Sequence, residues 1–151
     1  MNDINTTEGI LDFAIEQEQN AVDFYFNLSE TTVNQEMKAV FIQFAKEEMG
    51  HKAKLIQVQK TGMFEIGSVK INDLKIADFA VNISPNQALS YDEALILAMK
   101  REKAAFRLYT RLAERTEVAE LKQLFYNLAM EESKHKLRFE IEYDDFVLRE
   151  N

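Results

Sequence analysis

Two short segments of the sequence place a glutamate and a histidine three residues apart. The segment KEEMGHK contains Glu48 and His51, and the segment MEESKHK contains Glu132 and His135. Residues at positions i and i+3 of a helix project from the same side, one turn apart, so each pair could reach a single metal ion. Because carboxylates and imidazoles both bind divalent metals, metal binding is the first chemistry that these residues indicate.

The two segments belong to an internal repeat. A shift of 84 residues places the second half of the chain on the first without a gap. Glu18 then corresponds to Glu102, and the 30 residues from Glu18 to Glu48 equal the interval from Glu102 to Glu132. This agreement indicates a duplicated unit with pseudo-twofold symmetry. Other corresponding pairs are Ala14 and Ala98, Ala21 and Ala105, Tyr25 and Tyr109, Leu28 and Leu112, Phe41 and Phe125, and Ala45 and Ala129.

Six polar residues fall on helix faces that are otherwise apolar. A single glutamate there usually reaches water, and a single buried histidine is usually just hydrogen-bonded, but the repeat brings all six to one level. Four carboxylates in one core would repel each other and lose hydration, whereas two divalent cations would neutralise them. The neighbouring Glu47 and Glu131 group instead with charged residues on the solvent side. The predicted metal ligands are Glu18, Glu48, His51, Glu102, Glu132 and His135.

Helical periodicity extends over four long segments. They are expected at about residues 6–30, 33–60, 90–115 and from 117 to 146 or beyond. Glycine is scarce and Pro85 is the single proline, which favours helix over sheet. Gly62 is expected to end the second helix. The expected N-terminal caps are Asn5 with Glu8, Ser90 with Glu93, and Thr116.

The connections between these segments predict the topology. Joints near residues 31–32 and 115–116 are short, so each half of the chain should form an antiparallel helical hairpin. The connector from Thr61 to Leu89 could return along the whole bundle, at about 3.3 Å per extended residue. We expect an all-α, ferritin-like four-helix bundle with two hairpins joined by a long crossover, and a short helix within NDLKIADFAV. Residues 1–151 should form a single domain whose repeats span about residues 5–60 and 89–144.

Composition limits the classes of function and the cellular locations that are expected for the protein. The chain has 151 residues, a net charge of −8 and no cysteine. Without a basic patch, nucleic-acid binding is not expected. The lack of cysteine excludes disulfides, thiolate metal sites and a cysteine nucleophile from this chain. The start, MNDINTTEGI, lacks signal-peptide features, and no apolar run approaches the roughly 20 residues needed to span a bilayer. A cytoplasmic protein without a membrane partner is therefore expected.

The ligand set matches a known arrangement of two metals. Di-iron carboxylate bundles use one glutamate from each of two helices and a Glu-x-x-His pair from each of the other two. We expect Glu48 and Glu132 to bridge two iron ions, although manganese or zinc would also fit. The expected terminal pairs are Glu18 with His51 and Glu102 with His135, and which glutamate accompanies which histidine stays open.

Four segments carry a resemblance to a known family. EQNAVDFY, EEMGH, EKAAFRLY and EESKH, which begin at residues 18, 47, 102 and 131, resemble the rubrerythrin-type branch of the ferritin-like superfamily. The resemblance covers all four predicted helices and leaves the crossover unmatched. It implies a di-iron centre that reduces hydrogen peroxide or activates dioxygen.

The chain departs from the rubrerythrin pattern in two ways. Full rubrerythrins carry a cysteine-ligated, rubredoxin-like domain that delivers electrons, so this chain would need a separate electron donor protein. Rubrerythrins also have an additional site glutamate one turn after the third-helix ligand, where this chain has Ala105. The remaining six-ligand set resembles that of bacterioferritin, which keeps ferroxidase chemistry open.

Tyr25 and Tyr109 lie two turns beyond Glu18 and Glu102 on the same helix faces. Their hydroxyls could hydrogen-bond ligand carboxylates or quench one-electron intermediates. Alternatively, they could be ordinary core tyrosines.

Three functions follow from these features. The leading hypothesis is a di-iron peroxidase or oxidase that reduces hydrogen peroxide or dioxygen and protects against oxidative stress. The alternatives are a ferroxidase that handles iron and a metal-stabilised module that binds a partner. A homodimer or small homo-oligomer is expected.

Overall fold

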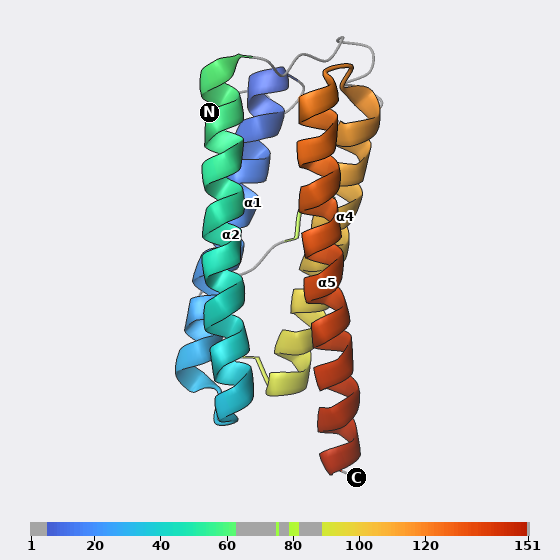
Figure 1. Cartoon of the computed structure of the whole chain (residues 1–151). Coiled ribbons are helices and arrows are strands. Elements are labelled where there is room, and N and C mark those ends of the chain that lie inside the picture. The colour runs from blue at the N-terminus through green and yellow to red at the C-terminus, as the bar shows by residue number, and fades with distance from the viewer. Residues whose placement is uncertain (1–5, 63–74, 76–78, 82–88, 151) are drawn as a thin grey trace.

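The computed structural model describes residues 6–62, 75, 79–81 and 89–150 of the chain. These residues form four long helices and no strand. Helices α1 (Thr7–Thr31) and α2 (Gln35–Thr61) form one antiparallel hairpin, and α4 (Tyr91–Arg115) and α5 (Ala119–Glu150) form the other (Figure 1). The predicted all-α four-helix bundle is confirmed. The predicted short helix in NDLKIADFAV lies largely outside the described residues.

Side chains and one glycine fix three helix ends, two on α2 and one on α4. Asn34 begins α2, because its side chain accepts a hydrogen bond from the Met37 amide at 3.0 Å. Gly62 ends α2 in the left-handed conformation, with φ of 65°, which an L side chain rarely adopts. Ser90 and Glu93 form a reciprocal capping box at the start of α4. The predictions for Gly62 and for the Ser90–Glu93 box are confirmed.

Two predicted caps are wrong. Helix α1 is capped by Thr6, whose hydroxyl accepts a hydrogen bond from the Gly9 amide at 2.9 Å, and not by Asn5. Thr116 does not cap α5. It ends α4 instead, because its amide donates to the Leu112 carbonyl at 3.1 Å. Threonine suits both roles, so sequence alone could not separate the end of one helix from the start of the next.

The apolar core has two parts, separated by a polar layer. One cluster, near the α4–α5 turn, includes Leu55 and Phe125. The other lies towards the α1–α2 turn and is rich in aromatic residues, among them Phe41 and Phe139, whose ring centroids are 5.9 Å apart. The predicted ligands lie in sequence between the residues of these clusters on every helix, so apolar side chains seal the polar layer at both ends. Among the described residues, no helix has the length and apolar character needed to cross a bilayer.

The capping box gives a test of this fold. Ser90→Ala should lower the free energy of unfolding by about 1 kcal/mol, because the alanine leaves an amide at the start of α4 without its acceptor. Urea unfolding followed by circular dichroism measures the change. Ser90→Asp is the matched control, since it keeps an acceptor and should stay close to the original stability. Equal stability of the alanine and aspartate variants would contradict this role.

Candidate metal centre

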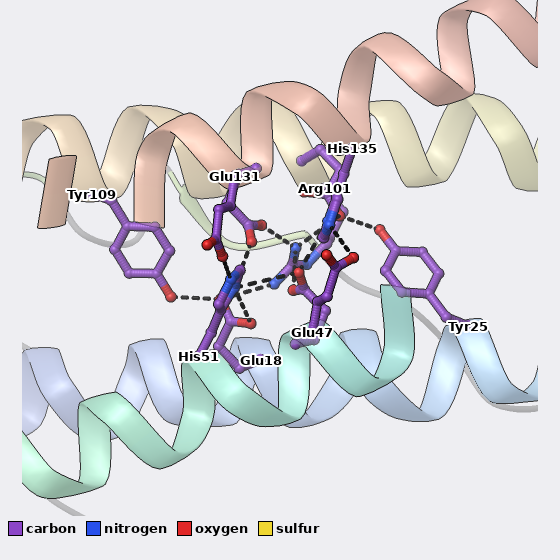
Figure 2. Close-up of polar contacts among 11 residues, drawn as sticks. Glu18, Tyr25, Glu47, His51, Arg101, Tyr109, Glu131 and His135 are labelled. Carbon is purple, nitrogen blue, oxygen red and sulfur yellow. Dashed lines mark hydrogen bonds and ion pairs between the residues drawn. The ribbon is translucent and has the colours of Figure 1, made fainter. Parts of the chain in front are cut away.

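The six predicted ligands meet in the polar layer. All four glutamates are completely buried, and both histidines are buried. Each of the four helices contributes at least one of them, and the histidines lie on α2 and α5. The layer therefore joins the two hairpins (Figure 2).

The ligand atoms form two groups, and in each group they lie within 4.8 Å of one another. Glu48 and Glu132 belong to both groups, as expected of carboxylates that bridge two ions. The Glu18 group consists of Glu18, Glu48, His51 and Glu132. The Glu102 group consists of Glu48, Glu102, Glu132 and His135.

Unsatisfied polar atoms test whether this layer suits metal ions. Every one of the six residues has a buried nitrogen or oxygen that receives no hydrogen bond from the described part of the chain. Buried polar atoms are normally paired, so six residues with unpaired atoms in one place are compatible with a bound cation. Glutamate and imidazole form the donor set of di-iron and di-manganese bundles. The residues therefore fit a dimetal site, and which metal they bind stays a prediction. The atoms are Glu18 Oε2, Glu48 Oε1, His51 Nδ1, Glu102 Oε2, Glu132 Oε1 and His135 Nδ1.

Both predicted tyrosines reach ligand carboxylates, and each reaches across to the other hairpin. Tyr109 on α4 donates a hydrogen bond to Glu18 Oε1 on α1 at 2.5 Å. Tyr25 on α1 donates to Glu102 Oε1 on α4. Burial, together with the nearby carboxylates, raises the pKa of both hydroxyls well above the ordinary value, so both remain donors. In Figure 2 the tyrosines flank the polar layer at its two ends.

Glu47 and Glu131 correct the assignment made from the sequence. Their side chains are 40 % and 43 % exposed, yet their carboxylates contact the buried histidines. Glu47 Oε2 lies 3.0 Å from His135 Nε2, and Glu131 contacts His51 Nε2. A carboxylate on one ring nitrogen orients the ring and leaves the other nitrogen for a metal. The repeat itself held this signal, because the 84-residue shift places Glu47 on Glu131.

Arg101 is the buried residue that the sequence analysis missed. Its guanidinium lies among the four glutamates and contacts each of them. Nη1 lies 2.7 Å from Glu48 Oε2 and 3.0 Å from Glu102 Oε1, and it also contacts Glu132. Nη2 lies 3.2 Å from Glu18 Oε1. No signal in the sequence indicated this, because Gln17 occupies the equivalent position in the repeat.

The crowded charges shift several pKa values. Burial opposes protonation of His51, but the carboxylates of Glu132 and Glu18 outweigh it and raise the pKa to about 11. Burial raises the pKa of Glu48 well above its ordinary value, and repulsion from Glu132 adds to this, against the attraction of Arg101. For Glu102, burial is outweighed by Arg101 and His135, so the pKa falls to about 2.

A helical bundle with a buried carboxylate and histidine cluster of this kind defines a ferritin-like protein with a candidate dimetal site. The chain matches the family model described as Rubrerythrin over residues 9–143, and it belongs to this family of ferritin-like di-iron proteins. The match extends through all four helices, so the resemblance noted in the sequence is confirmed. No curated protein and no solved structure matches the chain.

The histidines predict how stability depends on pH when a chelator removes metal. The pKa of His51 is about 11 in the folded protein and about 6.5 ordinarily. Its contribution to the free energy of unfolding is therefore complete below pH 6.5 and is lost as pH rises towards 11. The raised pKa values of His135 and Glu48 act in the same direction. Stability should fall between pH 6.5 and 9.

Urea unfolding at pH 6.5, 7.5 and 9 with a chelator present measures this dependence. The free energy of unfolding of His51→Gln should decline less steeply than that of the unaltered chain over this range. The variant lacks the imidazole that stays protonated in the folded state. An equal or steeper slope for the variant would contradict the charged His51.

Proposed function

We propose that the chain is a non-haem di-iron oxidoreductase that reduces hydrogen peroxide or dioxygen and protects against oxidative stress. The main support is that each of the six residues has a buried ligand atom without a hydrogen bond. These residues form two groups, and Glu48 and Glu132 belong to both. Membership of the rubrerythrin family supports the same function.

Reduction of hydrogen peroxide to two molecules of water consumes two electrons and two protons. Two iron ions held by the six ligands would supply Lewis acidity and the electrons. Tyr25 and Tyr109 hold Glu102 and Glu18 through their hydroxyls, and Glu47 orients His135. We further propose a separate electron donor protein, because the chain has no cysteine for an iron–sulfur or rubredoxin-like centre.

The space beside the layer favours a small oxidant. A cavity of about 10 Å³ borders Glu18, Arg101, Ala105 and Tyr109. This volume holds about one water molecule, so an organic substrate does not fit there without rearrangement. The cytoplasmic location and the homodimer or small homo-oligomer are part of the proposal and rest on the sequence.

Ala105 favours a second candidate function, the oxidation of Fe(II) for iron handling. Alanine lines the cavity at the position where the rubrerythrin pattern has an additional glutamate. The site then has the six-ligand set that resembles bacterioferritin, for which iron itself is the substrate. Repeated turnover with added Fe(II) would distinguish this function from peroxide reduction.

The two functions predict different oxidants. Protein loaded anaerobically with Fe(II) should be oxidised by hydrogen peroxide much faster than by dioxygen if it is a peroxidase, as stopped-flow absorbance would measure. Glu48→Gln should lose most of the rate, because it removes a charge that both groups share. Glu114→Gln, an exposed glutamate on α4, is the matched control and should retain the rate.

Three other outcomes would change the proposal. Faster oxidation by dioxygen that repeats with each Fe(II) addition would favour ferroxidase activity. Reaction with neither oxidant faster than free iron would overturn both redox functions. Large stabilisation by metal without any redox reaction would favour a metal-stabilised partner-binding module.

The tyrosine hydroxyls give a separate test. Tyr109→Phe removes the hydrogen bond to Glu18 while keeping the ring that stacks on Phe125. Loss of such an outer hydrogen bond should reduce metal affinity or oxidation rate by about 10- to 100-fold. Equilibrium dialysis and stopped-flow absorbance measure the two quantities. Tyr126→Phe, at a 39 % exposed residue of α5, is the control. If the two variants give the same metal affinity and oxidation rate, Tyr109 contributes only packing.

A further inference from the structure

Helix α5 carries an exposed apolar stripe on the side that faces away from the bundle. Five large apolar side chains of this helix are between 39 % and 74 % exposed. At 3.6 residues per turn they fall within an arc of about 60°, opposite the face that carries Phe125, His135 and Phe139. At 1.5 Å per residue they form a row about 33 Å long. The stripe residues are Tyr126, Met130, Leu137, Ile141 and Leu148.

The equivalent face of α2 lacks this stripe, although the repeat relates the two helices. The metal ligands do not require the difference, because both helices supply the same Glu-x-x-His pair. A continuous row of exposed apolar side chains is typical of an interaction surface. The corresponding residues of α2 and α5 are Lys46 and Met130, Ala53 and Leu137, and Gln57 and Ile141.

The spacing of the stripe is its most specific feature. Successive members are separated by 4, 7, 4 and 7 residues, so the pattern repeats every 11 residues. An 11-residue repeat is one of the periods with which two long helices pack along their length. Ser133 and Asp144 lie in the two seven-residue intervals, so one stripe alone is not a continuous apolar seam.

A second copy of the same helix, running antiparallel, fills both intervals. The stripe is centred on Leu137, because Tyr126 and Leu148 each lie 11 residues from it. With Leu137 of both copies on a twofold axis, Ile141 of one copy reaches the interval between Met130 and Leu137 of the other. Met130 likewise reaches the interval between Ile141 and Leu148. A parallel pairing in register would set each interval against itself and leave both unfilled.

Charges beside the stripe are compatible with this antiparallel pairing. Lys136 of one copy lies two residues along the axis from Glu140 of the other, and the twofold axis repeats the contact. Within one chain these two residues already pair at 2.6 Å, so two ion pairs come together on this flank. On the other flank Lys134 lies near Arg138 of the second copy, whose charge is balanced by Glu36 of its own chain at 3.0 Å.

We propose that the chain forms a twofold-symmetric dimer in which the α5 stripes of two copies pack antiparallel about Leu137. Two stripes of this length, with their flanks, bury on the order of 1,000 Å², which is the size that a specific interface needs. The inference does not rest on the metal chemistry of the proposed function, because both ligand groups are complete within one chain. It gives the homo-oligomer expected from the sequence an interface and a symmetry axis.

Analytical ultracentrifugation tests the dimer. The unaltered chain should sediment as a dimer, and Leu137→Glu should weaken the dimer by about 100-fold or more, because two carboxylates meet at the twofold axis. Leu137 is 57 % exposed, so the variant should keep the helical content and the Co(II) affinity of the unaltered chain. Ala53→Glu, at the equivalent position of α2, is the matched control and should remain dimeric.

Disulfide cross-linking tests the antiparallel register, and the chain has no cysteine of its own to interfere. Leu137→Cys should link to itself under mild oxidation, because facing helices bring its two copies within disulfide reach. Tyr126→Cys should link to Leu148→Cys when the two variants are mixed, and it should not link to itself.

Three results would overturn this inference. They are a monomeric unaltered chain, a dimer that Leu137→Glu leaves intact, and self-linking of Tyr126→Cys, which requires parallel helices. A monomer would assign the stripe to contact with a different protein. Co(II) binding by the monomeric Leu137→Glu variant reports on the metal centre separately, so failure of the dimer and failure of the proposed function are distinguishable.

Discussion

Four carboxylates buried in one layer form the constraint on which the rest of the structure depends. In water they would be solvated and separate, but here they are completely buried and contact common partners. Their charge has to be neutralised by cations or protons. Arg101 contributes a guanidinium, His51 retains a proton, and burial favours the neutral form of Glu48. Bound metal ions would take over part of the charge neutralisation that the guanidinium and the protons provide.

The apolar clusters on both sides of the layer enforce that constraint. The aromatic rings around Phe41 and Phe139 seal one end, and residues such as Leu55 and Phe125 seal the other. Without them the glutamates could turn towards water, and neither close contacts nor large pKa shifts would persist. The lengths of the four helices place apolar side chains on both sides of a polar layer near the middle of each helix.

Sequence patterns predicted that these glutamates and histidines are buried together, because burial on a helix is periodic and the repeat made the exceptions coincide. Glu18 and Glu102 could be assigned to the inner face from their own helices alone. The contacts of Tyr25 and Tyr109 could not, because each hydroxyl reaches a carboxylate on the other hairpin. Periodicity gives the face of a residue but not the reach of its side chain to another helix.

Long side chains explain the remaining differences. Glu47 and Glu131 begin on the solvent side, and their flexible stems bring the carboxylates to the histidines. The long side chain of Arg101 likewise reaches the buried layer. A residue next to Glu102 on a charged stretch of helix would normally be expected to point to water. Thr116 shows a different limit of prediction from the sequence. In a short turn between helices, one threonine could either end the first helix or begin the second.

Arg101 and Gln17 occupy equivalent positions of the repeat, and the difference between them has a consequence for how such a site can arise. A bundle assembled from two copies of one hairpin must carry the same residue at both positions, so it would hold two guanidiniums or none. A chain in which the hairpins are covalently joined can keep one copy charged and the other neutral. Fusion into a single polypeptide therefore permits something that a symmetric dimer of hairpins cannot have: one guanidinium placed among four carboxylates that the repeat otherwise relates in pairs.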